Sequence, residues 1–248
     1  MSEERGDGRL RAYNAGMGVL HAVQGIAVLL LSNDFALPVT AAFMEGPPGT
    51  PATTEQLFTL PIGPAVAGFL FLSAIAHLVV AGPGWGKYRR DLAAHRNEQR
   101  WIEYSLSSSL MIVLIAMITG IADIAALVAL FGVNAAMILF GWLQERYEEP
   151  GGGGWWPFAF GSISGIVPWI AIGIYLIGPG ADVPGFVYAI FVSLFVFFNS
   201  FAINQVLQYR QIGPWRNYLF GERVYVGLSL VAKSALAWQV FANTLVPT

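Results

Sequence analysis

The residue with the clearest chemical potential is Lys233, which lies nine residues into an apolar stretch that runs from about Val224 to Val246. A lysine near the middle of a membrane costs about 3 kcal/mol on insertion scales, so its presence needs a reason. Three roles fit it: one half of a structural ion pair, part of a transport pathway, or the attachment point of an aldehyde cofactor through a Schiff base. The residue alone leaves all three open.

Glu103 is the acid best suited to pair with Lys233, because it is the only carboxylate that we expect clearly inside a membrane span. A protonated Schiff base in a medium of low dielectric keeps its proton only beside an anion, so the cofactor role predicts Glu103 as counter-ion. The expected boundaries place Glu103 about a turn and a half nearer the inner face than Lys233. The alternative is an interfacial carboxylate that pairs with Arg100 or Arg96.

Two histidines, His21 and His77, are spaced so that both could lie on the Glu103 side of Lys233. Imidazoles there could store or relay a proton near neutral pH, although a membrane histidine also serves as a packing partner. Two histidines without a second acid or a cysteine make a weak metal site, so we predict no metal. The chain has no cysteine, which excludes disulfides and thiol chemistry.

The composition predicts the elements that must position these residues. The chain is 56% hydrophobic and 11% charged, whereas soluble domains carry about 25% charged residues. A net charge of -2 without a basic run argues against a nucleic-acid partner. We therefore expect an all-α, multi-pass protein of the cell membrane that forms one domain over residues 1–248. The charged N-terminus lacks the small-residue cleavage site of a signal peptide, so we expect it to be the start of an uncleaved first span. The expected spans are 10–31, 62–81, 101–119, 121–142, 155–178, 185–209 and 224–246.

The number of spans depends on a turn at Gly120, since one helix over 101–143 would be about 65 Å long. Seven spans with a cytoplasmic N-terminus and an extracellular C-terminus place 12 of the 13 basic residues inside. These are Arg5, Arg9, Arg11, Lys87, Arg89, Arg90, Arg96, Arg100, Arg146, Arg210, Arg216 and Arg223. The segment 32–61, which has no basic residue, becomes a long extracellular loop that could form a structured cap.

Two stretches carry a family resemblance. The strings RWIEYSLSSS (100–109) and LSLVAK (228–233) resemble the microbial rhodopsin pattern of arginine, aromatic, acid and aromatic, with the retinal lysine in the last helix. Longer strings resemble heliorhodopsin specifically, and that family has an inverted membrane orientation. They include NDFALPVT, GIADI, FGVNAAMILFGWLQE, LFVFFNSFA and LVAKSALAWQ.

This resemblance implies a cofactor and a set of site residues. It implies all-trans retinal bound covalently to Lys233, with Glu103 as counter-ion and Ser229 beside the Schiff base. A polar, proton-accepting region is implied at His21, Gln24, Ser73 and His77. The implied pocket walls are Trp101, Tyr104, Ser108, Asn134, Met137, Trp169 and Phe198, of which Trp169 and Phe198 could equally be packing aromatics. The family is also described as homodimeric, and Gly161 and Gly165 are compatible with close helix contact.

The sequence departs from the pattern of the proton-pumping microbial rhodopsins in ways that bear on function. The position of the pumps' internal proton donor falls at Leu114, Ser229 replaces their second acid, and the sixth span lacks their tryptophan and proline. A chain of titratable groups across the membrane is therefore missing. We expect a light sensor in the lipid bilayer that releases the Schiff-base proton toward Glu103 and the histidines and is read by a cytoplasmic partner.

Two other functions compete with the sensor. The first is a light-driven or light-gated proton transporter that uses the same lysine and acid. The second is a membrane enzyme that uses Lys233 without retinal, for which the sequence offers no nucleophile, metal set or phosphate loop; we therefore expect no enzymatic activity.

Overall fold

A computed structural model describes residues 2–178, 180 and 182–246, and the side chains of residues 2–7, including Arg5, lie outside the described part. Within this part, seven helices are long and apolar enough to cross a membrane, which confirms the predicted seven-helix bundle. They are α1 (Ser2–Leu31), α2 (Ile62–Ala81), α4 (Glu98–Ile118), α5 (Ile124–Tyr147), α6 (Trp156–Ile177), α7 (Gly185–Tyr209) and α8 (Tyr218–Val240). A π-helical turn, η2 (Phe241–Leu245), extends α8.

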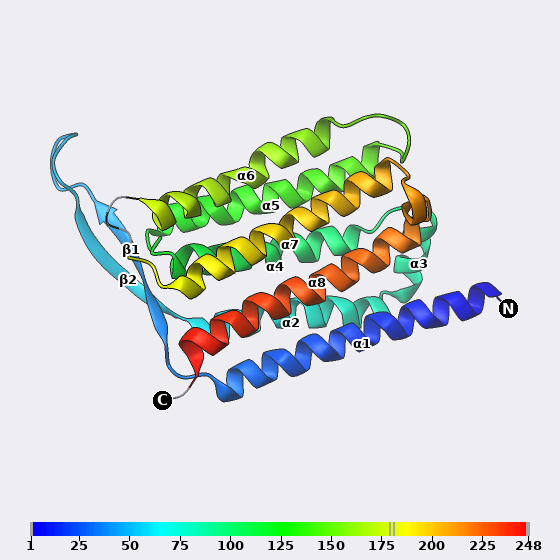
Figure 1. Ribbon diagram of the computed structural model, residues 1–248, viewed down its shortest axis with the longest axis horizontal. Coiled ribbons are helices and arrows are strands. Elements are labelled where there is room, and N and C mark those ends of the chain that lie inside the picture. The colour runs from blue at the N-terminus through cyan, green and yellow to red at the C-terminus, as the bar shows by residue number, and fades with distance from the viewer. Residues whose placement is uncertain (1, 179, 181, 247–248) are drawn as a thin grey trace.

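The helices run roughly side by side, so the bundle has two ends (Figure 1). We call the end that holds the start of α1 the N-terminal end. It also holds the short helices α3 (Trp85–Ala93) and η1 (Gly213–Arg216), which the sequence analysis did not predict. The last helix begins six residues before the expected Val224, because Asn217 caps it by accepting a hydrogen bond from the Leu219 amide.

The other end, which we call the hairpin end, is covered by the segment between α1 and α2. Strands β1 (Ala36–Phe43) and β2 (Thr53–Pro61) form an antiparallel hairpin with an irregularity between Val39 and Thr40. The amide of Thr40 donates to the carbonyl of Ala122, so the hairpin is attached to the turn between α4 and α5.

Asn33 fastens the start of the hairpin to the end of the last helix. Its side-chain amide donates to the carbonyls of Thr244 and Val246, and its backbone amide donates to that of Leu245. Its side-chain oxygen accepts from the Phe35 amide. The ends of α1 and α8 are thereby joined at the hairpin end.

The turn between α4 and α5 lies where the sequence requires it. Gly120 has a φ of 103°, in the left-handed region that a residue without Cβ enters at little cost. Asp123 then caps α5 by accepting hydrogen bonds from the amides of Ala125 and Ala126. Together they allow the chain to reverse after Ile118.

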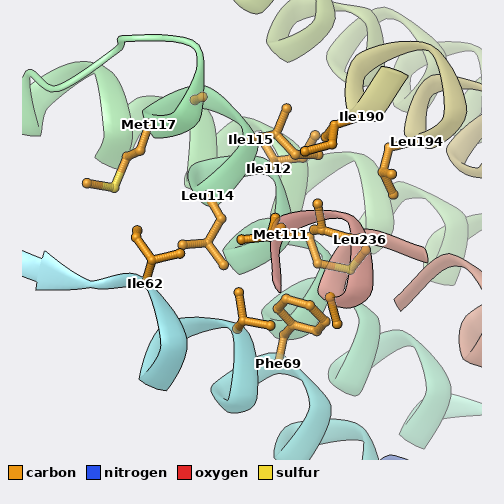
Figure 2. Close-up of a cluster of buried hydrophobic side chains, with 14 of the residues drawn as sticks. Ile62, Phe69, Met111, Ile112, Leu114, Ile115, Met117, Ile190, Leu194 and Leu236 are labelled. Atoms are coloured by element: carbon orange, nitrogen blue, oxygen red, sulfur yellow. The ribbon is translucent and has the colours of Figure 1, made fainter. Parts of the chain in front are cut away.

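The hairpin half of the bundle is filled by apolar side chains from α2, α4, α7 and α8 (Figure 2). Leu114 and Ile115 of α4, Phe69 of α2 and Leu236 of α8 belong to this core, and all four are fully buried. The polar side chains described below lie between this core and the N-terminal end.

Candidate functional site

Lys233 and Glu103 are in direct contact. The ammonium Nζ of Lys233 on α8 lies 2.7 Å from Oε1 of Glu103 on α4, and both side chains are buried. The long lysine side chain bridges the axial offset that the sequence predicts between the two residues. The buried cation therefore has a carboxylate partner, which offsets the cost of its desolvation.

Two hydroxyls complete the surroundings of the ammonium. Lys233 Nζ donates to Oγ of Ser73 at 2.5 Å and to Oγ of Ser229 at 3.0 Å. Ser73 also donates to Glu103 Oε1 at 2.7 Å. An ammonium has three N–H donors, and Glu103, Ser73 and Ser229 accept all three.

The two histidines lie together beside this site. The rings of His21 on α1 and His77 on α2 are stacked with centroids 5.7 Å apart. His77 Nδ1 lies 2.9 Å from the Asn14 side-chain oxygen, whereas neither ring nitrogen of the fully buried His21 has a hydrogen-bond partner among the described residues. Gln24, which we expected in this region, instead accepts a hydrogen bond from the Trp238 indole where α1 meets α8.

A small polar cavity extends from Glu103 toward the N-terminal end. His77, Asn14, Arg100 and Tyr88 are among the residues that line it. Burial raises the pKa of Tyr88, so its phenol stays neutral at physiological pH. Neutral hydroxyl and amide groups around a buried carboxylate are typical of a cavity that holds water.

A larger cavity reaches Lys233 from the other side of Glu103. Its walls come from α4, α5, α6, α7 and α8. Five of the seven expected wall residues line it, namely Trp101, Tyr104, Ser108, Met137 and Phe198. Ser229 and Lys233 also belong to the lining.

The other two expected wall residues support the wall from behind. The Asn134 amide donates to Ser108 Oγ at 2.9 Å and to Ser109 Oγ at 3.0 Å. Trp169 packs edge-on against Phe198, with ring centroids 5.4 Å apart. Sequence reasoning missed many lining residues, since nothing in their spacing identifies them: Ser107, Met111, Ile138, Gly141, Phe158, Gly161, Ser162, Phe201, Ala202, Gln205, Tyr225 and Ala232.

The expectation that Glu103 is the only carboxylate inside a span is wrong. Glu145 on α5 and Glu222 on α8 are 7% and 0% exposed, and both form ion pairs with the buried Arg100. The expected spans ended before Glu145 and began after Glu222, so both acids were assigned to loops. Arg100 thus pairs with these two acids and not with Glu103, and Glu103 pairs with Lys233.

Trp101 can form part of the cavity wall because Gly141, which its ring contacts, has no side chain. A Cβ at Gly141 would lie 2.5 Å from Cζ3 and 2.7 Å from Cη2 of the Trp101 ring, which is too close for any side chain. We therefore expect Gly141→Ala to displace the indole and lower stability by about 1–3 kcal/mol, as overpacking does.

The matched control is Gly132→Ala on the same helix, where a Cβ meets nothing within 4 Å. This substitution should be neutral or slightly stabilising, because alanine favours helix over glycine by about 1 kcal/mol. Thermal unfolding of the purified variants measures both effects. Equal melting temperatures for the two variants would contradict the close packing of Gly141 and Trp101.

Comparison with known proteins agrees with this geometry. A family model described as Heliorhodopsin matches residues 10–245, which is nearly the whole chain. A search of curated proteins finds no match. The match confirms the resemblance drawn from the helix motifs. With seven apolar helices and a family match over this length, the chain is a multi-pass membrane protein and belongs to the heliorhodopsins, a family of retinal-binding microbial rhodopsins.

Proposed function

We propose that this chain binds all-trans retinal covalently through Lys233 and is a photoreceptor that senses light without pumping ions. Bound retinal would supply the absorption of visible light and a change of shape on isomerisation. The cavity that includes Lys233 in its wall supports this fit, because it is lined mostly by apolar and aromatic side chains with a few polar groups, as cofactor sites usually are.

In this proposal Glu103 is the anion that keeps the proton on Lys233 Nζ. It is the acid in contact with Nζ, and Arg100 does not compete for it because Arg100 pairs with Glu145 and Glu222. Ser73 and Ser229 each accept a hydrogen bond from the free Lys233 ammonium. A protonated Schiff base has a single N–H, so in the pigment Glu103 would accept this bond and the two hydroxyls would line the site beside it.

The same contacts support a route for the proton after illumination. Glu103, the stacked pair His21 and His77, and the polar cavity lie on one side of Lys233, toward the N-terminal end. We propose that the proton leaves Nζ in this direction and returns by the same groups. His21, which lacks a partner among the described residues, is a site that could accept it.

One observation carries the proposal that the protein does not pump. Between Lys233 and the hairpin end, the interior is filled by fully buried apolar side chains such as Leu114, Ile115 and Leu236. A pump needs titratable groups or water on both sides of its proton-binding site. Among the described residues, the histidines and the polar cavity lie on one side of Lys233, whereas the polar pair found toward the hairpin end, Ser193 and Gln239, does not titrate. We therefore expect no relay for a released proton through the hairpin half.

The second candidate function is light-gated proton conduction. The polar cavity beside Glu103 favours it, because it forms half of a pathway toward the N-terminal end. Conduction would require the apolar hairpin half to admit water during illumination.

We also propose that the N-terminal end faces the cytoplasm, that the protein is a homodimer without enzymatic activity, and that a cytoplasmic partner reads its signal.

Covalent attachment predicts that the pigment depends on one lysine. With all-trans retinal added, the wild type should show a visible absorption band and Lys233→Ala should show none, because the amine is gone. The chain has one other lysine, the exposed Lys87, which bonds to Asp91 and Glu98, so Lys87→Ala is a matched control that should keep the band. A band in Lys233→Ala would overturn the attachment site.

The counter-ion role predicts a charge-dependent spectrum. Glu103→Gln keeps the size of the side chain and removes its charge, so the visible band should move strongly or give way to near-ultraviolet absorption at neutral pH. The control is Glu98→Gln on the same helix, which should leave the band in place. If the spectrum and its pH titration are unchanged in Glu103→Gln, another group balances the charge.

If the protein does not pump, illumination should move no protons across the membrane. Cells that contain the pigment should show no light-induced change in the pH of an unbuffered suspension. A pH change that a protonophore abolishes would favour the transporter instead. A known light-driven proton pump in the same cells shows that the assay detects transport.

A further inference from the structure

A buried cluster of charges lies at the N-terminal end of the bundle, beyond the proposed proton route. Arg100 on α4 pairs with Glu145 on α5 and with Glu222 on α8, and all three side chains are buried. We call these three residues the ion cluster. It joins three helices at the end where the proposed signalling surface lies.

Glu145 is the most heavily bonded member of the ion cluster. It accepts from Arg100 Nη2 at 2.8 Å, the Asn97 amide at 2.8 Å, the Tyr218 hydroxyl at 2.8 Å and the Trp101 indole Nε1 at 2.6 Å. A buried carboxylate needs its donors, because an ionised group without them carries a large desolvation cost. Loss of one donor would therefore favour a rearrangement of the cluster.

Trp101 is also a wall of the cavity that reaches Lys233. Its ring packs beside the Arg100 guanidinium, with Cζ 4.5 Å from the centroid, and Arg100 lies 4.0 Å from the ring of Tyr225, another wall residue. The absence of a Cβ at Gly141 is what allows the indole to lie directly against α5. Trp101 and Tyr225 thus both contact the proposed retinal cavity and the ion cluster, and of the two it is Trp101 that donates a hydrogen bond to the cluster.

We propose that Trp101 is the positioning residue that couples the cavity to the N-terminal end. A change in the shape of the cavity moves the indole, the Trp101–Glu145 hydrogen bond breaks, and the ion cluster loosens so that α5 and α8 shift relative to each other. This inference rests on the proposed function, since it needs a light-driven change in the cavity.

The test uses the full-length pigment and the absence of native cysteines. Spin labels are attached at Tyr147→Cys near the end of α5 and at Arg223→Cys on α8, both exposed positions, and the distance between the labels is measured in the dark and after illumination. We expect a light-induced shift in the wild-type background and its loss in Trp101→Phe, which keeps an aromatic wall and removes the N–H donor.

The control is Trp238→Phe, which removes an indole donor that bonds to Gln24 between α1 and α8, away from the cavity lining and the ion cluster; it should keep the shift. A pigment whose visible band responds to light but whose labels do not move overturns this inference and leaves the photoreceptor proposal standing. A full shift in Trp101→Phe, or loss of the shift in both tryptophan variants, also overturns it. A colourless wild type overturns both proposals.

A second measurement needs no light and no retinal. The indoles of Trp101 and Trp215 each donate a 2.6 Å hydrogen bond, to Glu145 and to Asn204 respectively. In a Trp215→Phe background, ultraviolet resonance Raman spectra of the retinal-free protein should therefore contain the signal of a strongly hydrogen-bonded indole that disappears in Trp101→Phe and weakens in Glu145→Gln. Glu145→Gln keeps every cavity residue, so it also decides the label experiment if Trp101→Phe does not fold. An unchanged indole signal and an undiminished label shift in Glu145→Gln would contradict the coupling.

Discussion

The buried contact between the Lys233 ammonium and the Glu103 carboxylate is the constraint around which the other polar groups are arranged. A charge pair in an apolar interior is tolerated only when its remaining donors and acceptors are satisfied. Ser73 and Ser229 meet this need, so α2, α4 and α8 must approach one another at this level. Arg100, one turn before Glu103 on the same helix, has its own acids and does not disturb the pair.

This pair also lies at a boundary within the bundle. Toward the hairpin end the interior is apolar, with Leu114 and Leu236 among its fully buried side chains. Toward the N-terminal end it contains stacked histidines, a polar cavity and the ion cluster. A site that exchanges protons with one side only suits storage and return of a proton better than its transfer across a membrane, and the proposed sensor uses this asymmetry.

The sequence was enough to predict residues whose charged side chains cost much free energy in a membrane and whose position within a span is unambiguous. Lys233 and Glu103 meet both conditions, and a hydropathy profile with a turn at Gly120 was enough to obtain seven spans. Glu145 and Glu222 were missed because a charged residue at the end of an apolar stretch reads as part of a loop. Gly141 and Tyr225 were missed for a different reason: which side chains meet across neighbouring helices depends on helix rotation and packing, and periodicity does not fix these.

The bonds of Asn33 to the backbone of residues 244–246 have a mechanical consequence. They fasten α1 and α8 together beneath the hairpin, whereas near the other end these helices are joined by a longer bond, from the Tyr13 hydroxyl to the Arg223 carbonyl at 3.4 Å. Because α8 is held firmly at the hairpin end, a small rotation at Lys233 would displace the far tip of α8 most, once the ion cluster that holds this tip loosens as proposed. This tip carries Tyr218 and Glu222, and the side-chain amide of Asn33 holds the opposite, fixed end.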